Sequence, residues 1–191
     1  MLLVLGALLV VVLSVFLATS DDFPSSNMGG KDGKLGGEFT LTGIDGEVSL
    51  SDFRGKVVML YFGFVNCSQV CPTSMRIMQK TLAEMDSNEL GQVQAILISF
   101  DTEDSYQTLA AYTKKFHPNI LGLTGTVKQI NTVIDEYGAY YGPNDLEEFD
   151  AGLAYRHSSR YYIVNQQGEL VDAMRHSTTA NELRARLRTL I

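Results

Sequence analysis

The feature that most constrains the fold of this chain is a short apolar run that leads directly into its only two cysteines. Residues 56–64 read KVVMLYFGF, and the following VNCSQVCPTSM places Cys67 and Cys71 in a Cys-x-x-x-Cys-Pro motif. A short run that is apolar nearly throughout is typical of a strand buried on both faces of a sheet. Pro72 suits the first turn of a helix. The sequence therefore predicts a buried strand, a turn that carries both thiols, and then a helix.

The rest of the folded region alternates short apolar runs with helical patterns. Asp45 and Gly46 separate two alternating segments, which is a strong signal for a β-hairpin. Further predicted strands are 93–100, 120–125, 160–165 and 169–174, and the predicted helices start at Pro72, cover 104–116 and 126–141, and run from a Thr179/Glu182 capping box to Arg188. This order predicts a three-layer α/β fold with a central mixed sheet flanked by helices. A thioredoxin-like fold with an N-terminal hairpin accounts for it.

Composition limits the classes of protein to consider. A chain of 191 residues that is 45% hydrophobic can bury one well-formed core, so we expect one folded domain. The formal net charge is −7, and the 15 lysines and arginines are scattered, which argues against a nucleic-acid partner. Two cysteines are too few for a disulfide framework, so we expect them to have a chemical use.

The N-terminal segment predicts attachment to a membrane. Residues 1–18 carry no charge and as a helix would span about 27 Å, close to the thickness of a bilayer core. We favour a transmembrane anchor or uncleaved signal over a cleaved signal peptide, for which residues 18–20 offer a cleavage site. The basic residues expected beside such a segment are missing, which leaves open that the true start of the protein lies upstream. Residues 19–37 are rich in Ser, Asp and Gly and predict a flexible linker, so the folded domain is expected at 38–191.

The two cysteines are predicted to sit where a strand ends and a helix begins. A helix N-terminus stabilises a thiolate and lowers its pKa, and the turn should leave both sulfurs accessible. Residues four apart on a helical turn lie on one face, so Cys67 and Cys71 can meet. That arrangement permits a disulfide, and it equally permits two thiolates to bind one soft metal ion with a third ligand. The remaining interpretation is that Cys67 and Cys71 are two structural thiols that happen to lie close together.

A third ligand would be a histidine, and the chain has three. His117 is expected in an exposed loop, and His176 is expected to have a surface or capping role. His157 lies just before a strand predicted near the centre of the sheet and is the best candidate. Met75 and Met78 follow the spacing of a buried helix face, so we expect them to pack under the helix rather than to bind metal.

Several separated motifs together resemble those of the Sco/SenC family of membrane-tethered, thioredoxin-like proteins. They are YFGFVNCSQVCPTSM (61–75), LTGT (123–126) and RHSSRYYIVNQQGELV (156–171), and the similarity covers roughly residues 38–190. The resemblance implies that Cys67, Cys71 and His157 bind copper. It also implies delivery of copper to the dinuclear copper site of cytochrome c oxidase, with the copper-binding oxidase subunit and other copper chaperones or thiol reductants as partners.

Other readings stay open beside copper delivery. Zinc would also accept two thiolates and an imidazole. The runner-up is a membrane-tethered thiol-disulfide oxidoreductase that uses Cys67 and Cys71 as a redox pair and reduces cysteines of an oxidase subunit. A peroxidase and an inert binding domain explain the motif less well. A membrane segment combined with redox-active thiols places the domain outside the cytoplasm, on a single-pass anchor facing the periplasm or its equivalent, since the chain lacks an Arg-rich mitochondrial transit segment.

Overall fold

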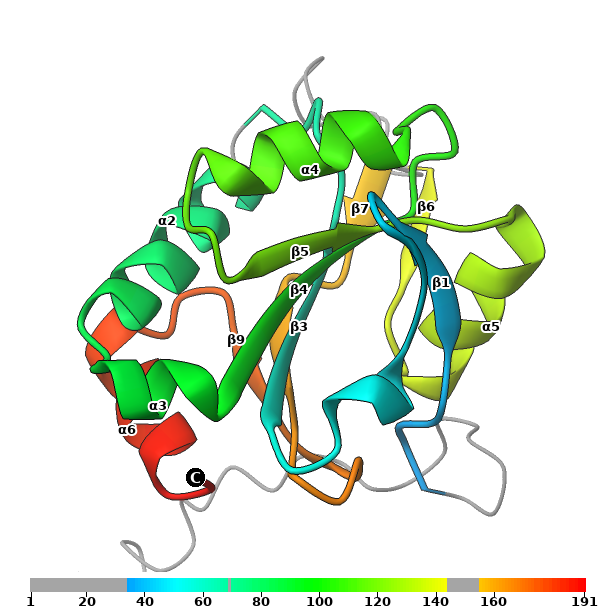
Figure 1. The fold of residues 1–191 in the computed structure, drawn as a ribbon. Coiled ribbons are helices and arrows are strands. Elements are labelled where there is room, and N and C mark those ends of the chain that lie inside the picture. The colour runs from blue at the N-terminus through cyan, green and yellow to red at the C-terminus, as the bar shows by residue number, and fades with distance from the viewer. Residues whose placement is uncertain (1–33, 69, 144–154) are drawn as a thin grey trace, which may run out of the picture.

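The centre of the protein is a five-stranded mixed sheet (Figure 1). The computed structural model describes residues 34–68, 70–143 and 155–191. The strands lie in the order β5-β4-β3-β8-β9, with bounds Ile120–Leu123, Val93–Ser99, Val57–Gly63, Arg160–Val164 and Leu170–Arg175. Strands β3, β4 and β5 are parallel, whereas β8 is antiparallel to both β3 and β9. The predicted central mixed sheet is therefore confirmed.

Two small sheets accompany the central one. Strands β1 (Thr40–Gly43) and β2 (Gly46–Ser49) form the predicted hairpin, and Gly46 supplies the positive φ of 120° that its turn requires. Strands β6 (Tyr141–Pro143) and β7 (Tyr155–His157) form an antiparallel pair that the sequence did not predict.

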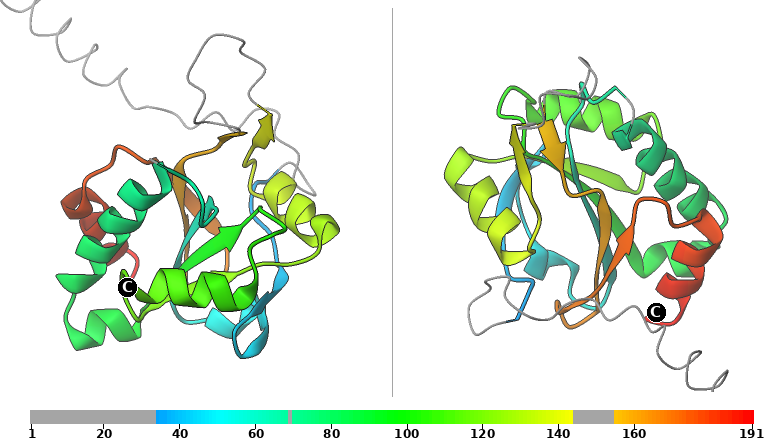
Figure 2. Two further views of the ribbon diagram at one scale, coloured as in Figure 1. Left: turned by 90° about the horizontal axis from the view of Figure 1, so that it is seen from above. Right: turned by 180° about the vertical axis from the view of Figure 1, so that it is seen from behind.

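The helices cover both faces of the sheet (Figure 2). On one face, α2 (Val70–Ala83) packs beside α6 (Ala180–Arg188), and α5 (Val127–Glu136) covers the other. Helix α4 (Tyr106–Lys114) lies along β5, and two short elements complete the fold, the 3-10 helix η2 (Leu50–Phe53) and α3 (Ser87–Gly91). Helix α3 was not predicted, since five residues are too few to show a helical period.

The helix predicted over 126–141 is shorter than expected. It ends at Glu136, because Gly138 takes a φ of 59° and its N–H donates to the carbonyl of Asp135 at 3.2 Å. The next N–H, that of Ala139, donates to the carbonyl of Ile134 at 2.9 Å. These two bonds form a Schellman motif, which stops the helix and frees the chain to form β6.

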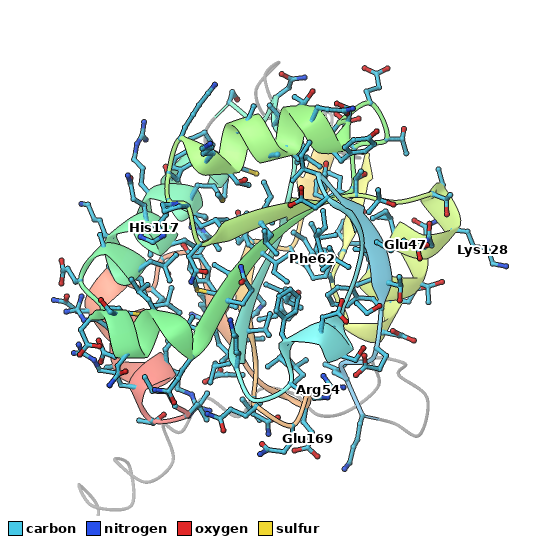
Figure 3. All side chains as sticks on the ribbon, viewed as in Figure 1. Glu47, Arg54, Phe62, His117, Lys128 and Glu169 are labelled. Atoms are coloured by element: carbon cyan, nitrogen blue, oxygen red, sulfur yellow. The ribbon has the colours of Figure 1, made fainter. Side chains whose placement is uncertain are left out.

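Strand β3 divides the core into two clusters. Met59 and Tyr61 point to the face that α2 and α6 cover, here called the cysteine face, because Cys67 and Cys71 belong to its cluster. Leu60 and Phe62 point to the opposite face, and Figure 3 shows the Phe62 ring inside the molecule. All seven residues of β3 are buried, as expected for a strand covered on both faces.

Most of the predicted N-terminal region precedes the described residues. The described residues contain no helix long and apolar enough to cross a bilayer. The predicted membrane segment, residues 1–18, lies outside the described residues, and so does most of the predicted linker at 19–37.

Candidate metal centre

The structure brings Cys67 and Cys71 together at the C-terminal end of β3. Cys67 lies in the turn before α2, and Cys71 lies in the first turn of that helix. The backbone N–H of Cys71 lies 3.4 Å from Sγ of Cys67, to which it donates. The predicted proximity of the two sulfurs is thus present. The expected accessibility of both sulfurs is not found, because Cys67 is 6% exposed and Cys71 is fully buried.

Burial changes the acid-base character expected of the motif. A hydrogen bond with Cys67 and then burial raise the pKa of the Cys71 thiol well above its usual range. The prediction that a helix N-terminus lowers the thiol pKa is therefore wrong for Cys71. The dipole at the start of α2 does not offset two effects that disfavour the Cys71 thiolate, the neighbouring sulfur of Cys67 and the loss of contact with water.

Gly63 lies directly against the sulfur of Cys71. A Cβ atom built on Gly63 would lie 2.9 Å from Sγ of Cys71, 3.1 Å from Cε1 of Tyr61 and 3.3 Å from Cδ1 of Leu97. No larger residue fits without displacing the sulfur, since carbon atoms pack at about 3.5–4.0 Å. Sequence reasoning missed this residue, although an isolated glycine inside a strand pattern signals a close approach.

Asp104 fixes the loop that carries Cys67. Its Oδ2 accepts hydrogen bonds from the N–H of Val65 at 2.9 Å and from Oγ of Ser99 at 2.7 Å. The carboxylate is buried, with 5% of the residue exposed. It therefore connects the end of β4 to the chain two residues before Cys67. Val65 and Asp104 are 39 residues apart in sequence, so no local pattern could have revealed the pair.

The backbone of His157 lies at the same end of the sheet as the cysteines. Strand β8 is antiparallel to β3, with Tyr161 opposite Tyr61, so β8 begins where β3 ends. His157 is in β7, three residues before β8, and β7 lies at that end in Figure 1. The Ser159 side chain is close enough to the Tyr61 hydroxyl to influence its pKa. The side chain of His157 lies outside what the structure describes.

The other two histidines differ in position, because His117 precedes β5 at the end of the sheet opposite the cysteines, whereas His176 follows β9 at the same end. His117 follows α4 and is partly buried rather than fully exposed, and its Nδ1 accepts from the N–H of Asn119 at 3.1 Å. Burial lowers the pKa of His117. His176 is exposed, as expected, and its backbone N–H donates to the carbonyl of Ser159 at 2.9 Å. Within the described ranges, no three His, Cys, Asp or Glu side chains gather into a possible metal site.

The two methionines follow the sequence prediction. Met75 and Met78 are fully buried on the inner face of α2, in the same cluster as Cys71. They pack under the helix, as the spacing indicated. The sulfur-containing residues of α2 therefore form a continuous apolar layer beneath the cysteine turn.

Fold and site together define a thioredoxin-like α/β protein with a cysteine pair between a central strand and a helix. The sequence pattern of the SCO1/SenC family matches residues 28–191. The chain belongs to the SCO1/SenC family, as the resemblance of its motifs indicated.

Individual relatives agree with this assignment. Human "Protein SCO1 homolog, mitochondrial" is 34% identical over 158 residues, which are 81% of this chain and 52% of the human protein. Yeast "Protein SCO2, mitochondrial" is 34% identical over 143 residues, or 73% of this chain and 47% of the yeast protein. The chain thus spans about half the length of these curated relatives.

Solved structures share the fold over most of the chain. Bradyrhizobium japonicum ScoI with copper bound has a TM-score of 0.71 and 30% identity, covering 82% of this chain and 99% of its own. Yeast Sco1 with copper bound has a TM-score of 0.70 and 30% identity, and the match covers 82% of this chain and 87% of the yeast chain. Apo Sco1 from Thermus thermophilus has a TM-score of 0.73 and 29% identity, covering 82% and 92%.

Proposed function

We propose that this protein binds one copper ion through Cys67, Cys71 and His157 and delivers it to the dinuclear copper site of cytochrome c oxidase. The observation that carries the proposal is the convergence of the two cysteines at the end of β3, with the backbone N–H of Cys71 on Sγ of Cys67. Relatives that are about 30% identical have been solved with copper bound. A more distant solved relative, BsSco at 20% identity, is described as a member of the Sco family of cytochrome c oxidase assembly proteins.

The donor set suits the cargo. Two thiolates and one imidazole form a soft, low-coordinate site that favours Cu(I), and additional or solvent ligands allow Cu(II). Gly63 and Asp104 would hold the two sulfurs in place, the first by contact with Cys71 and the second through the loop before Cys67. Cys67 is the more exposed of the two sulfurs, so an oxidase subunit or another copper chaperone would exchange with it first.

A thiol-disulfide oxidoreductase is the second candidate. It would use Cys67 and Cys71 alone, and the approach of the N–H of Cys71 to Sγ of Cys67 supports it equally well. Its substrates would be cysteines of an oxidase subunit. Only the copper function needs His157, so this residue separates the two candidates.

The test is a Cu(I) titration of the full chain under anaerobic, reducing conditions against a chromogenic chelator. Wild type, His157→Ala, and the controls His117→Ala and His176→Ala would be compared. The proposal predicts one bound copper, with affinity lowered at least tenfold in His157→Ala and unchanged in both controls. Equal affinity in wild type and His157→Ala would remove the histidine from the site and favour the oxidoreductase.

We also propose a membrane-tethered arrangement, with residues 1–18 as anchor or uncleaved signal, 19–37 as linker and 38–191 as the copper-binding domain facing the periplasm. The apolar character of residues 1–18 supports it. Relatives include mitochondrial proteins and a Bacillus anthracis lipoprotein. Separation of membrane and soluble fractions from the native host tests the anchor, which predicts the full-length chain in the membrane fraction.

A further inference from the structure

The two edges of the central sheet are covered in different ways. On the outer side of β5, the backbone of Thr42 in β1 exchanges two hydrogen bonds with that of Thr124, at 2.7 and 3.0 Å. Strand β9 forms the other edge, and no strand of the described residues pairs with its outer side. Another chain can add a strand to the backbone groups of such an edge, which leads to self-association.

Ala173 turns its backbone toward the outer side of β9. In an antiparallel ladder, residues that bond the neighbouring strand alternate with residues whose N–H and C=O face away from it. Ala173 lies opposite Tyr162 and is of the second kind, because side chains bond both of its backbone groups. These are groups that an added strand would need.

Two charged side chains occupy the backbone groups of Ala173. Oδ1 of Asp172 accepts from the N–H of Ala173 at 2.8 Å. The carbonyl of Ala173 accepts from the guanidinium of Arg160 at 3.0 Å. Arg160 belongs to β8 and lies two residues before Tyr162, so its side chain is on the same face of the sheet as Ala173. The donor and the acceptor of Ala173 are thus both satisfied within the chain.

Arg186 of α6 orients the carboxylate of Asp172. Its Nε donates to Oδ2 of Asp172 at 2.8 Å, while Oδ1 bonds the N–H of Ala173. The side chains of Arg186 and Asp172 are 31% and 37% exposed, and a surface pair of this kind adds little to stability. Its effect is to hold the carboxylate over the edge.

Backbone segments cover the two ends of the β9 edge. At its start, a Cβ on Gly36 would lie 2.7 Å from Cβ of Leu170, so the segment before β1 lies directly against the strand. At its end, the carbonyl of Arg175 accepts from the N–H of Thr178 at 2.9 Å. Ala173 lies between these ends, where the cover consists of side chains.

We propose that Asp172 and Arg160 close the outer edge of β9 to strand addition, and that without them a second copy of this chain pairs with the edge at Ala173. The partner is a second copy because every copy carries the same strand, and two identical edge strands can pair antiparallel about a two-fold axis. The inference goes beyond the proposed function, since it holds whatever the cysteines bind.

The experiment removes the two side chains and measures self-association. Sedimentation velocity would compare the full-length wild type, Asp172→Ala and the double variant Asp172→Ala/Arg160→Ala over a range of protein concentrations. Detergent micelles would be kept in excess over protein, so that two chains do not share a micelle. Amide hydrogen exchange at low and high protein concentration reports whether association protects the N–H of Ala173, and circular dichroism checks the fold.

Two controls separate the hydrogen bonds from the charges. Asp172→Asn removes the charge but keeps a side-chain oxygen that can accept from the N–H of Ala173. The double variant Glu47→Ala/Lys128→Ala also removes one acidic and one basic residue. Both of these residues are exposed, Glu47 on β2 and Lys128 on α5, and Figure 3 shows Lys128 pointing away from the molecule.

The proposal predicts monomers for the wild type, Asp172→Asn and Glu47→Ala/Lys128→Ala. The association constant of Asp172→Ala/Arg160→Ala should be at least tenfold higher than that of wild type, a factor that corresponds to about 1.4 kcal/mol. Exchange of the Ala173 amide should slow as this variant associates. Asp172→Ala uncovers only the N–H and should show a smaller increase, which provides the test if the double variant does not fold.

Three results would overturn the proposal. The first is a folded double variant, or a folded Asp172→Ala where the double variant does not fold, that stays as monomeric as wild type. The second is equal association of Asp172→Asn and Asp172→Ala, or of the two double variants, because charge loss would then be the cause. The third is association that leaves exchange of the Ala173 amide unchanged, because the contact would then lie elsewhere.

Discussion

Replacing Gly63 with alanine should disturb the cysteine pair more than any other single-methyl addition to β3. The added Cβ would lie 2.9 Å from Sγ of Cys71, whereas close-packed atoms sit about 3.5–4.0 Å apart, so the sulfur must move by roughly 0.6–1 Å. Cε1 of Tyr61 at 3.1 Å and Cδ1 of Leu97 at 3.3 Å close the other directions. Overpacking of this kind costs about 1–3 kcal/mol.

Two readouts check this expectation. Urea unfolding of Gly63→Ala should give a free energy of unfolding lower by about 1–3 kcal/mol, and Cu(I) affinity should fall at least tenfold because one sulfur has moved. Gly91→Ala is the control, since a Cβ on Gly91 meets nothing within 4 Å. It should retain both stability and affinity. A Gly63→Ala variant with wild-type stability and affinity would refute the packing argument.

Three further predictions concern the surroundings of the site. Asp104→Ala should lower the free energy of unfolding by about 1–3 kcal/mol and speed hydrogen exchange of the Val65 amide, because that N–H loses its buried acceptor. Asp104→Asn should keep much of the protection from exchange. Equal exchange rates in the two variants would contradict this prediction. Met78→Ala should lower the free energy of unfolding by about 2–5 kcal/mol with unchanged copper stoichiometry, and a lost copper equivalent would make Met78 a ligand. The hydrogen bond from Arg188 lowers the pKa of Glu89 to about 2, so the pair stabilises the fold above the unfolded carboxyl pKa and this contribution fades as pH falls toward 2. Arg188→Gln should therefore unfold at higher pH in an acid titration, and an unchanged midpoint would show that the pair contributes nothing.

Local patterns predicted the elements that depend on local physics. The apolar run at 56–64 and Pro72 placed β3 and α2 correctly, and the Thr179 capping box is present, with Oγ1 of Thr179 accepting from the N–H of Glu182 at 3.3 Å. The helix over 126–141 was predicted too long because the Gly138 stop was overlooked.

The surroundings of the cysteines could not be predicted, because they come from tertiary packing. Spacing alone placed Cys67 near Cys71, but their burial depends on the way α2 lies against the sheet. Asp104 bonds the loop before Cys67 and Tyr112 packs against the core cluster that contains both cysteines, and both come from segments beyond β4 in the chain. Nothing in a single sequence marks such residues as neighbours of a motif some 40 positions away.

Both cysteines are almost entirely removed from solvent. Cys71 is fully buried and Cys67 is 6% exposed, so the proposed copper transfer would begin at Cys67 or follow a movement of the turn. The turn has fixed points on both sides, the Asp104 carboxylate before Cys67 and the α2 helix after it. In the proposed function, exchange at Cys67 would need only the short stretch between these two points to move.

X-ray absorption at the copper edge of the Cu(I)-loaded full chain is the most direct test of the proposed centre. The account predicts two sulfur ligands and one nitrogen ligand in the wild type, with the imidazole nitrogen lost in His157→Ala and retained in His117→Ala. Spectra that are identical in wild type and His157→Ala, or that show only sulfur ligands in the wild type, would contradict the assignment of Cys67, Cys71 and His157 as the copper site.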